Sequence, residues 1–129
     1  MEGRADCRTI LIVEDDADIR ETLQHLLEAS GYRAAPASNG KVALDLIDTM
    51  GRPCLILLDL MMPVMDGWAF LSALDQNDGL ADVPIVIVSA YTDKVASLER
   101  AQQILKKPVD IHALMEVVRQ HCGPGEVTS

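Results

Sequence analysis

Short apolar runs alternate with longer amphipathic segments along this chain, and this alternation is the feature that most constrains its fold. The runs at 54–58 and 85–88 contain almost no polar residue, as is typical of strands covered on both faces. Similar or weaker runs complete a predicted set of five strands, at residues 9–13, 32–35, 54–58, 85–88 and 104–105.

The segments between the runs have helical periodicity. After Asp16, a good N-cap, apolar residues recur at Ile19, Leu23 and Leu27, and Gly31 is a suitable stop. We expect further helices at 42–50, 68–74, 94–100 and 110–121. Strands that alternate with helices predict an α/β fold, in which a doubly wound parallel sheet carries helices on both faces.

The length of 129 residues fits one domain. We expect it at residues 8–122, with flexible termini at 1–7 and 123–129. No apolar run approaches the roughly 20 residues that a membrane span needs, and no apolar core of a secretion signal occurs near residue 1. A cytoplasmic location, away from the membrane, follows by default.

Charge and cysteine content narrow the range of partners. The formal net charge of −9 disfavours direct contact with nucleic acid and favours basic partners and divalent cations. Three cysteines, Cys7, Cys54 and Cys122, show no paired spacing. We therefore expect reduced thiols rather than a disulfide framework.

Polar side chains follow four of the five predicted strands. Glu14 and Asp15 come after the first strand, Asp59 after the third, Ser89 after the fourth and Lys107 after the fifth. Ligands of open parallel sheets bind beyond the carboxyl ends of the strands. We therefore expect these five residues to form one site.

The residue types indicate phosphoryl chemistry. Crowded carboxylates repel one another, so some of them must be protonated or must recruit a cation, and oxygen ligands suit Mg²⁺ or Mn²⁺. Lys107 and Ser89 supply a positive charge and a hydroxyl for a phosphoryl group, and Asp59 is the candidate nucleophile. Alternatively, residues 14–16 are only a solvated helix N-terminus, and Lys107 is only a surface lysine.

Several short stretches together resemble the receiver domain of two-component response regulators, the CheY-like superfamily. They are residues 10–16, 57–63, 66–67, 88–90 and 107–108, and the resemblance extends over about residues 8–122. It implies a flavodoxin-like fold with a five-stranded parallel sheet in the order 2-1-3-4-5.

The resemblance also implies a role for each site residue. Asp59 matches the phosphoacceptor, which takes its phosphoryl group from a phosphohistidine of a sensor histidine kinase or histidine phosphotransfer protein. Asp15 and Asp59 would bind Mg²⁺ directly, Glu14 through water, and Met61 through its backbone carbonyl. Ser89 matches the switch hydroxyl and Lys107 the phosphate-pairing lysine, and the Lys107–Pro108 bond is usually cis in the family.

By this resemblance the protein switches its binding to a downstream protein and is not a conventional enzyme. It catalyses only its own phosphotransfer and a slow autodephosphorylation. We expect the slow decay because bulky Met61 and Tyr91, each two residues beyond a site residue, exclude the attacking water. The chain is expected to be a stand-alone receiver, a phosphorelay intermediate or a domain of a longer protein.

The sequence departs from the family on one face. Ile104 replaces the usual aromatic switch residue, Arg100 stands where a glycine usually ends the fourth helix, and the stretch from Ser89 to Lys107 is about one helical turn short. These changes fall on the fourth helix, fifth strand and fifth helix. We therefore expect normal phosphorylation but an atypical readout.

Two other functions compete with this one. A haloacid-dehalogenase-like phosphatase would also use an aspartyl nucleophile, but it needs a general acid where this chain has Met61. A degenerate receiver would signal without phosphate, which the complete set of acid, hydroxyl and lysine argues against.

Overall fold

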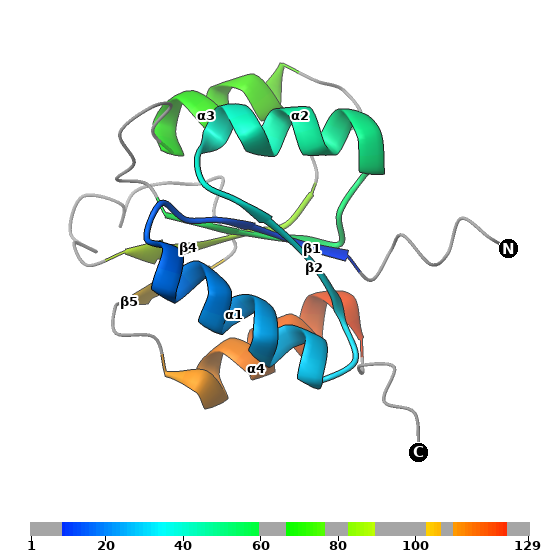
Figure 1. Ribbon diagram of the computed structural model, residues 1–129, viewed down its shortest axis with the longest axis vertical. Helices are drawn as coiled ribbons and strands as arrows, with labels where there is room; N and C mark the ends of the chain where they lie inside the picture. The colour runs from blue at the N-terminus through cyan, green and yellow to red at the C-terminus, as the bar shows by residue number, and fades with distance from the viewer. Residues whose placement is uncertain (1–8, 60–66, 77–82, 90–102, 107–109, 124–129) are drawn as a thin grey trace, which may run out of the picture.

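A parallel β-sheet forms the centre of the protein in the computed structural model, which describes residues 9–59, 67–76, 83–89, 103–106 and 110–123. In this described part, the strand order is β2-β1-β3-β4-β5 (Figure 1). The strands are β1 (Thr9–Val13), β2 (Arg33–Ala37), β3 (Leu55–Leu58), β4 (Ile85–Ser89) and β5 (Gln103–Lys106). This confirms the predicted flavodoxin-like fold with a parallel sheet.

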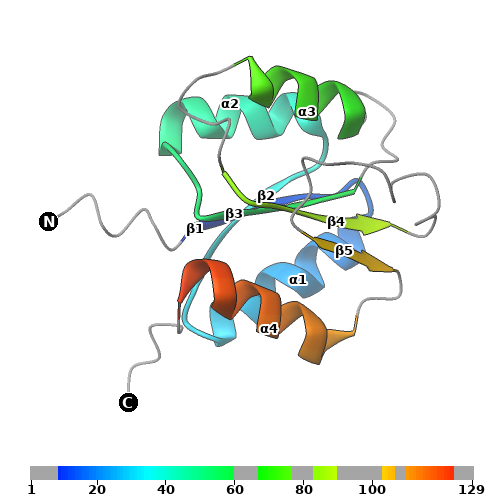
Figure 2. The same ribbon diagram turned by 180° about the vertical axis from the view of Figure 1, so that it is seen from behind.

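Helices pack against this sheet as layers. The described helices are α1 (Ala17–Ala29), α2 (Gly40–Met50), α3 (Gly67–Asp75) and α4 (Ile111–Cys122). In both views α2 and α3 lie together over one face, and α1 and α4 lie together over the other (Figures 1 and 2). Among the described residues, no helix is both long and apolar enough to span a membrane. The expected helix at 94–100 lies outside the described residues.

Successive strand residues enter opposite layers of the core. Leu11 and Val13 of β1 belong to a cluster with Phe70 of α3, whereas Ile10 and Ile12 pack in a second cluster that includes residues of α1 and α4. Because both faces of the strands are buried, polar residues do not alternate with apolar ones along them. It also leaves the ends of the strands as the places for polar side chains.

Side-chain caps fix where α1 and α2 begin, and the sequence predicts the first of these caps. The Asp16 carboxylate accepts hydrogen bonds from the backbone N–H groups of Asp18 and Ile19, and the Asn39 side chain accepts one from Val42. Capping of this kind satisfies N–H groups that lack a partner within the helix. The N-cap residue Asp16 lies two residues after Glu14, so α1 begins directly beside the candidate site.

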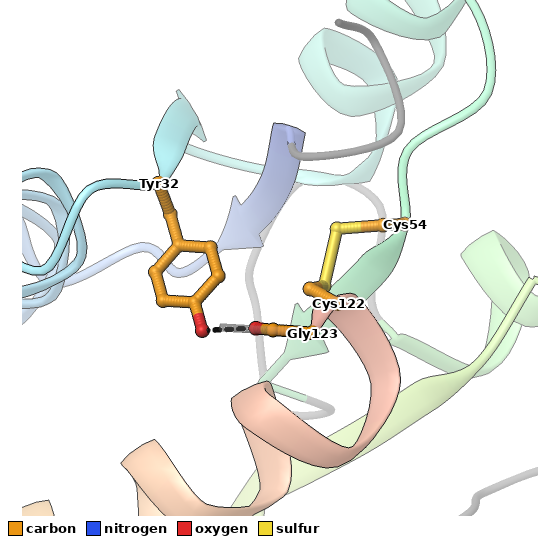
Figure 3. Close-up of a disulfide and its surroundings, with 4 residues drawn as sticks. All are labelled: Tyr32, Cys54, Cys122 and Gly123. Atoms are coloured by element: carbon orange, nitrogen blue, oxygen red, sulfur yellow. Dashed lines mark hydrogen bonds between the residues drawn. A yellow bond between two sulfur atoms is a disulfide. The ribbon is translucent and has the colours of Figure 1, made fainter. Parts of the chain in front are cut away.

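The expectation of reduced thiols is wrong for Cys54 and Cys122, which form a disulfide with their Cα atoms 5.7 Å apart. The bond joins the chain just before β3 to the last residue of α4 (Figure 3). Beside it, the buried Tyr32 donates its hydroxyl hydrogen to the carbonyl oxygen of Gly123. The two residues of the disulfide are 68 positions apart, so local cysteine spacing gives no sign that the fold brings them together.

Candidate functional site

The ends of the two central strands bring the acidic residues together. Because Val13 pairs with Leu58, the next residues, Glu14 and Asp59, also lie side by side. The Asp59 N–H donates to the Val13 carbonyl at 2.9 Å, and the Glu14 N–H donates to the Ala37 carbonyl of β2 at 3.0 Å. Ladder hydrogen bonds therefore extend onto both acidic residues and fix their backbones.

Glu14, Asp15 and Asp59 form a compact acidic cluster. One carboxylate oxygen of each lies within 4.8 Å of those of the other two. Glu14 is 2% exposed and Asp59 5% exposed, whereas Asp15 is exposed. Buried carboxylates so close together need a compensating positive charge. Three oxygen donors at this spacing fit a hard divalent ion such as Mg²⁺.

Asp16 belongs to the same acidic run but has a different task. Its carboxylate caps α1, and its backbone N–H donates to Oε2 of Glu14 at 3.2 Å. The reading of residues 14–16 as only a solvated helix N-terminus therefore fits Asp16 alone. Glu14 is buried against the sheet instead, and the cluster includes Asp59 from another strand.

Arg20 is part of the site's surroundings, and the sequence analysis missed it. Its Nη1 donates to the Glu14 carbonyl at 2.9 Å and to the Asp15 carbonyl at 3.4 Å. Arg20 stands one helical turn after Asp16, whose carbonyl accepts the Arg20 N–H. A side chain at this position can reach back to the residues before the helix. That spacing is the only signal that the sequence offered.

Other predicted site residues are placed only in part. Ser89 is the last residue of β4, and its backbone pairs with Lys106 of β5, so it lies at the carboxyl edge of the sheet. Ile104 lies within β5 opposite Ile87. Several expectations concern residues outside the described ranges: Met61, Tyr91, Arg100, Lys107 and the Lys107–Pro108 bond.

A flavodoxin-like sheet with three clustered carboxylates at its carboxyl edge defines a class of α/β domains with an acidic site that fits a divalent ion. Comparison with known proteins identifies the family. The response regulator receiver domain model matches residues 10–119, and the chain belongs to that family.

Named relatives match this chain over most of its length. It is 31% identical over 121 residues to the polar-differentiation response regulator DivK of Brucella anthropi, covering 90% of this chain and 97% of DivK. It is 39% identical over 114 residues to the transcriptional regulatory protein PrrA of Mycobacterium tuberculosis, covering 85% of this chain. The chain spans only 48% of PrrA.

A solved structure of a relative contains the expected ion. The receiver domain of a sensor histidine kinase from Pseudomonas aeruginosa, with a magnesium ion coordinated in its active-site cleft, superposes with a TM-score of 0.81. It is 25% identical in sequence, and the match covers 91% of this chain and 98% of the other. This protein is thus a receiver domain of two-component signalling, a signalling domain rather than a conventional enzyme. Its acidic cluster is typical of a phosphoacceptor site.

Proposed function

We propose that Asp59 accepts a phosphoryl group from a phosphohistidine of a sensor histidine kinase or histidine phosphotransfer protein. An Asp59 oxygen forms the new P–O bond while the P–N bond of the phosphohistidine breaks. The imidazole keeps the electron pair of that bond and takes up a proton. The observation that carries this proposal is the convergence of Asp59 with Glu14 and Asp15 within 4.8 Å.

The proposed metal ligands are the carboxylates of Asp15 and Asp59, with Glu14 acting through water and Met61 through its backbone carbonyl. When bound, Mg²⁺ or Mn²⁺ neutralises charge on the phosphoryl oxygens. The burial of Glu14 and Asp59 supports this assignment, because a low-dielectric setting strengthens attraction to a cation.

Ser89 and Lys107 complete the proposed site. We assign to Ser89 a hydrogen bond to a phosphoryl oxygen and to Lys107 an ion pair with the phosphoryl group. The position of Ser89 at the end of β4 supports its role. Ser89 pairs with Lys106, and Lys107 is the next residue in the sequence.

The output is proposed to be a change in binding to a downstream protein, by a domain at residues 8–122 that works in the cytoplasm. Direct contact with nucleic acid is disfavoured by the net charge of −9. Isoleucine at position 104, where the family usually has an aromatic residue, supports a readout that does not use an aromatic switch residue.

The test is phosphorylation by acetyl phosphate with intact-mass detection. Wild-type protein with Mg²⁺ should gain the mass of one phosphoryl group, and peptide mapping should place it on Asp59. Asp59→Asn, and wild-type protein in EDTA, should remain unlabelled. Mg²⁺-independent labelling, or equal labelling of Asp59→Asn, would contradict the proposal, and repeated turnover of a phosphate ester would favour a phosphatase.

A further inference from the structure

We propose that Arg20 is a positioning residue for the divalent ion, holding the backbone from which Asp15 reaches the site. This inference rests on the proposed function of the acidic cluster. Arg20 is half-buried on α1 and stands five residues after Asp15. Its contacts are with carbonyl oxygens of that turn, so it acts on the ligands rather than on the phosphoryl group.

The members of the cluster are not held equally. Glu14 is anchored to β2 through its N–H, which donates to the Ala37 carbonyl, and Asp59 is anchored to β1 in the same way through the Val13 carbonyl. Asp15 lies one residue beyond the last ladder bond of β1, and its side chain is exposed. The direction of the Asp15 side chain therefore depends on the peptide groups on either side of it.

Arg20 binds those two peptide groups. The Glu14 carbonyl belongs to the peptide before Asp15, and the Asp15 carbonyl belongs to the peptide after it. Nη1 of Arg20 donates to the first at 2.9 Å and to the second at 3.4 Å. Because each peptide group is planar, fixing both carbonyl directions restricts the rotation that would swing Asp15 away from Glu14 and Asp59.

The guanidinium also carries a positive charge, which acts in the opposite direction. Charge alone predicts that Arg20 repels a divalent ion and that its removal tightens binding. Positioning predicts that its removal weakens binding, because groups that orient metal ligands commonly contribute about ten-fold or more to metal affinity. Charge repulsion and positioning therefore predict opposite changes in the dissociation constant of the divalent ion when Arg20 is replaced.

The test measures the dissociation constant for Mn²⁺ from the electron paramagnetic resonance signal of the free ion. Competition with Mg²⁺ then gives the constant for Mg²⁺. We expect Arg20→Met to bind Mn²⁺ about ten-fold more weakly than wild type. Arg20→Lys keeps the charge and can donate to at least one carbonyl, so its affinity should lie between the two. Thermal unfolding in EDTA checks that each variant is folded before the metal is added.

Arg33→Met is the matched control. Arg33 is exposed at the start of β2 opposite Thr9, about 16 Å along β1 from Glu14 at the usual rise per residue. Arg33→Met removes the same charge as Arg20→Met, but at a distance from the cluster greater than the Debye length. The dissociation constant for Mn²⁺ should therefore not change. Arg33→Met binding Mn²⁺ as weakly as Arg20→Met would show that the loss of affinity is not specific to the Arg20 contacts, and it would overturn the inference.

Two further outcomes separate this inference from the proposed function. If Arg20→Met and Arg20→Lys bind Mn²⁺ as tightly as wild type or more tightly, while wild-type Asp59 is still labelled by acetyl phosphate, the positioning role of Arg20 fails and the phosphoacceptor proposal stands. If the wild-type chain binds no divalent ion, both fail together.

Discussion

At the scale of single residues, three neighbouring acidic side chains have three different environments. Glu14 is buried, Asp15 is exposed, and Asp16 caps a helix. Their differences come from the backbone: β1 ends at Val13 and α1 begins at Ala17, so only three residues turn the chain from the sheet to the helix. Two of them project into the cluster with Asp59.

Asp15→Asn should change the free energy of unfolding in opposite directions without and with metal, because Asp15 both repels the neighbouring carboxylates and is a proposed metal ligand. Without metal, the variant should be slightly more stable than wild type, because one of three crowded charges is gone. With Mg²⁺ at ten times the wild-type Kd, wild type should gain about 1.4 kcal/mol in its free energy of unfolding, and the variant much less. Urea unfolding with Mg²⁺ and with EDTA measures both effects.

The matched control for that experiment is Asp18→Asn. Asp18 lies in the first turn of α1 and carries the same charge outside the cluster, so its Mg²⁺ stabilisation should equal that of wild type. An Asp15→Asn protein that Mg²⁺ stabilises as strongly as wild type would contradict a role for Asp15 in metal binding.

Phosphate lifetime is a second prediction at this scale. The bulk of Met61 and Tyr91 is expected to keep water from the in-line position, so Met61→Asn and Tyr91→Ala should speed the loss of phosphate. The measurement is the decay of phosphorylated protein after removal of the phosphate donor. Unchanged decay in both variants would refute the expected shielding.

The sequence predicted the acidic cluster but not Arg20, whose guanidinium donates to the backbone carbonyls of Glu14 and Asp15. Glu14, Asp15 and Asp59 could be predicted because each directly follows an apolar run, and the ends of parallel strands meet at one edge. Arg20 could not, because arginine on an amphipathic helix is most often a solvated side chain. Its contacts are with backbone carbonyls, which residue type does not reveal.

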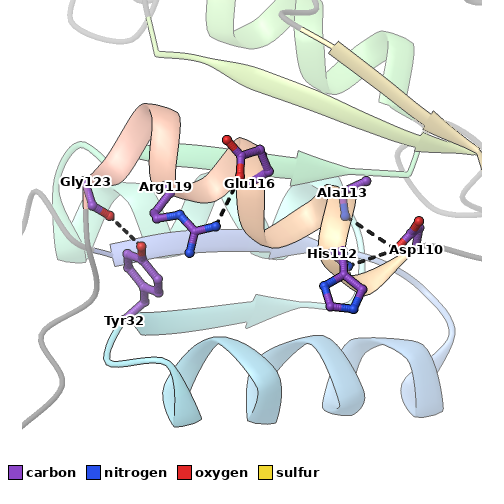
Figure 4. A network of polar contacts seen from close by, with 7 residues as sticks. All are labelled: Tyr32, Asp110, His112, Ala113, Glu116, Arg119 and Gly123. Atoms are coloured by element: carbon purple, nitrogen blue, oxygen red, sulfur yellow. Dashed lines mark hydrogen bonds and ion pairs between the residues drawn. The ribbon is translucent and has the colours of Figure 1, made fainter.

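At the scale of elements, α4 is fixed at its two ends by different interactions (Figure 4). Asp110 caps its start by accepting hydrogen bonds from the His112 and Ala113 N–H groups. At its end, Gly123 has a φ of 74°, a left-handed conformation that favours glycine, and its carbonyl accepts the Tyr32 hydroxyl hydrogen. Between them, Arg119 and Glu116 form an exposed ion pair, which contributes little.

Asp110→Ala should therefore lower the free energy of unfolding by about 1 kcal/mol, the usual effect of losing an N-cap. Asp110→Ser should retain most of the stability, because serine also caps helices well. The labelling of Asp59 should not change in either variant. A stability loss in Asp110→Ser as large as in Asp110→Ala would contradict capping as the cause.

Element positions were easier to predict than element ends. Buried strands such as β1 agree with their apolar runs because burial on both faces requires such residues. The edge strand β2 extends to Ala37, two residues beyond its predicted end at Ala35, and β5 covers Gln103–Lys106 rather than Ile104–Leu105. Backbone pairing with a neighbour sets these ends, and it depends little on side-chain type.

At the scale of the whole molecule, the Cys54–Cys122 disulfide joins the residue before β3 to the last residue of α4, 68 positions further along the chain. A crosslink of that span reduces the entropy of the unfolded chain and is expected to stabilise the fold by about 4 kcal/mol. Disulfides persist in oxidising compartments and are rare in reducing ones. The redox state of this pair therefore has a large predicted effect on stability.

Urea unfolding of the same protein with and without a thiol reductant measures that effect. The oxidised form should unfold at clearly higher urea concentration, whereas Cys7→Ser should behave as wild type in both conditions. Equal midpoints for oxidised and reduced wild type, with the oxidised bond verified by mass, would contradict the predicted contribution.

The most direct test of the acidic cluster is a Mg²⁺ titration followed by backbone amide resonances. Binding at one site should shift residues 13–16 and 58–59 together along a single saturating curve, because β1 and β3 both supply ligands. Asp59→Asn should strongly lower the Mg²⁺ affinity that this curve measures. Shifts spread over the exposed acidic residues of α1, or no shift at either strand end, would show that these carboxylates do not form one metal site.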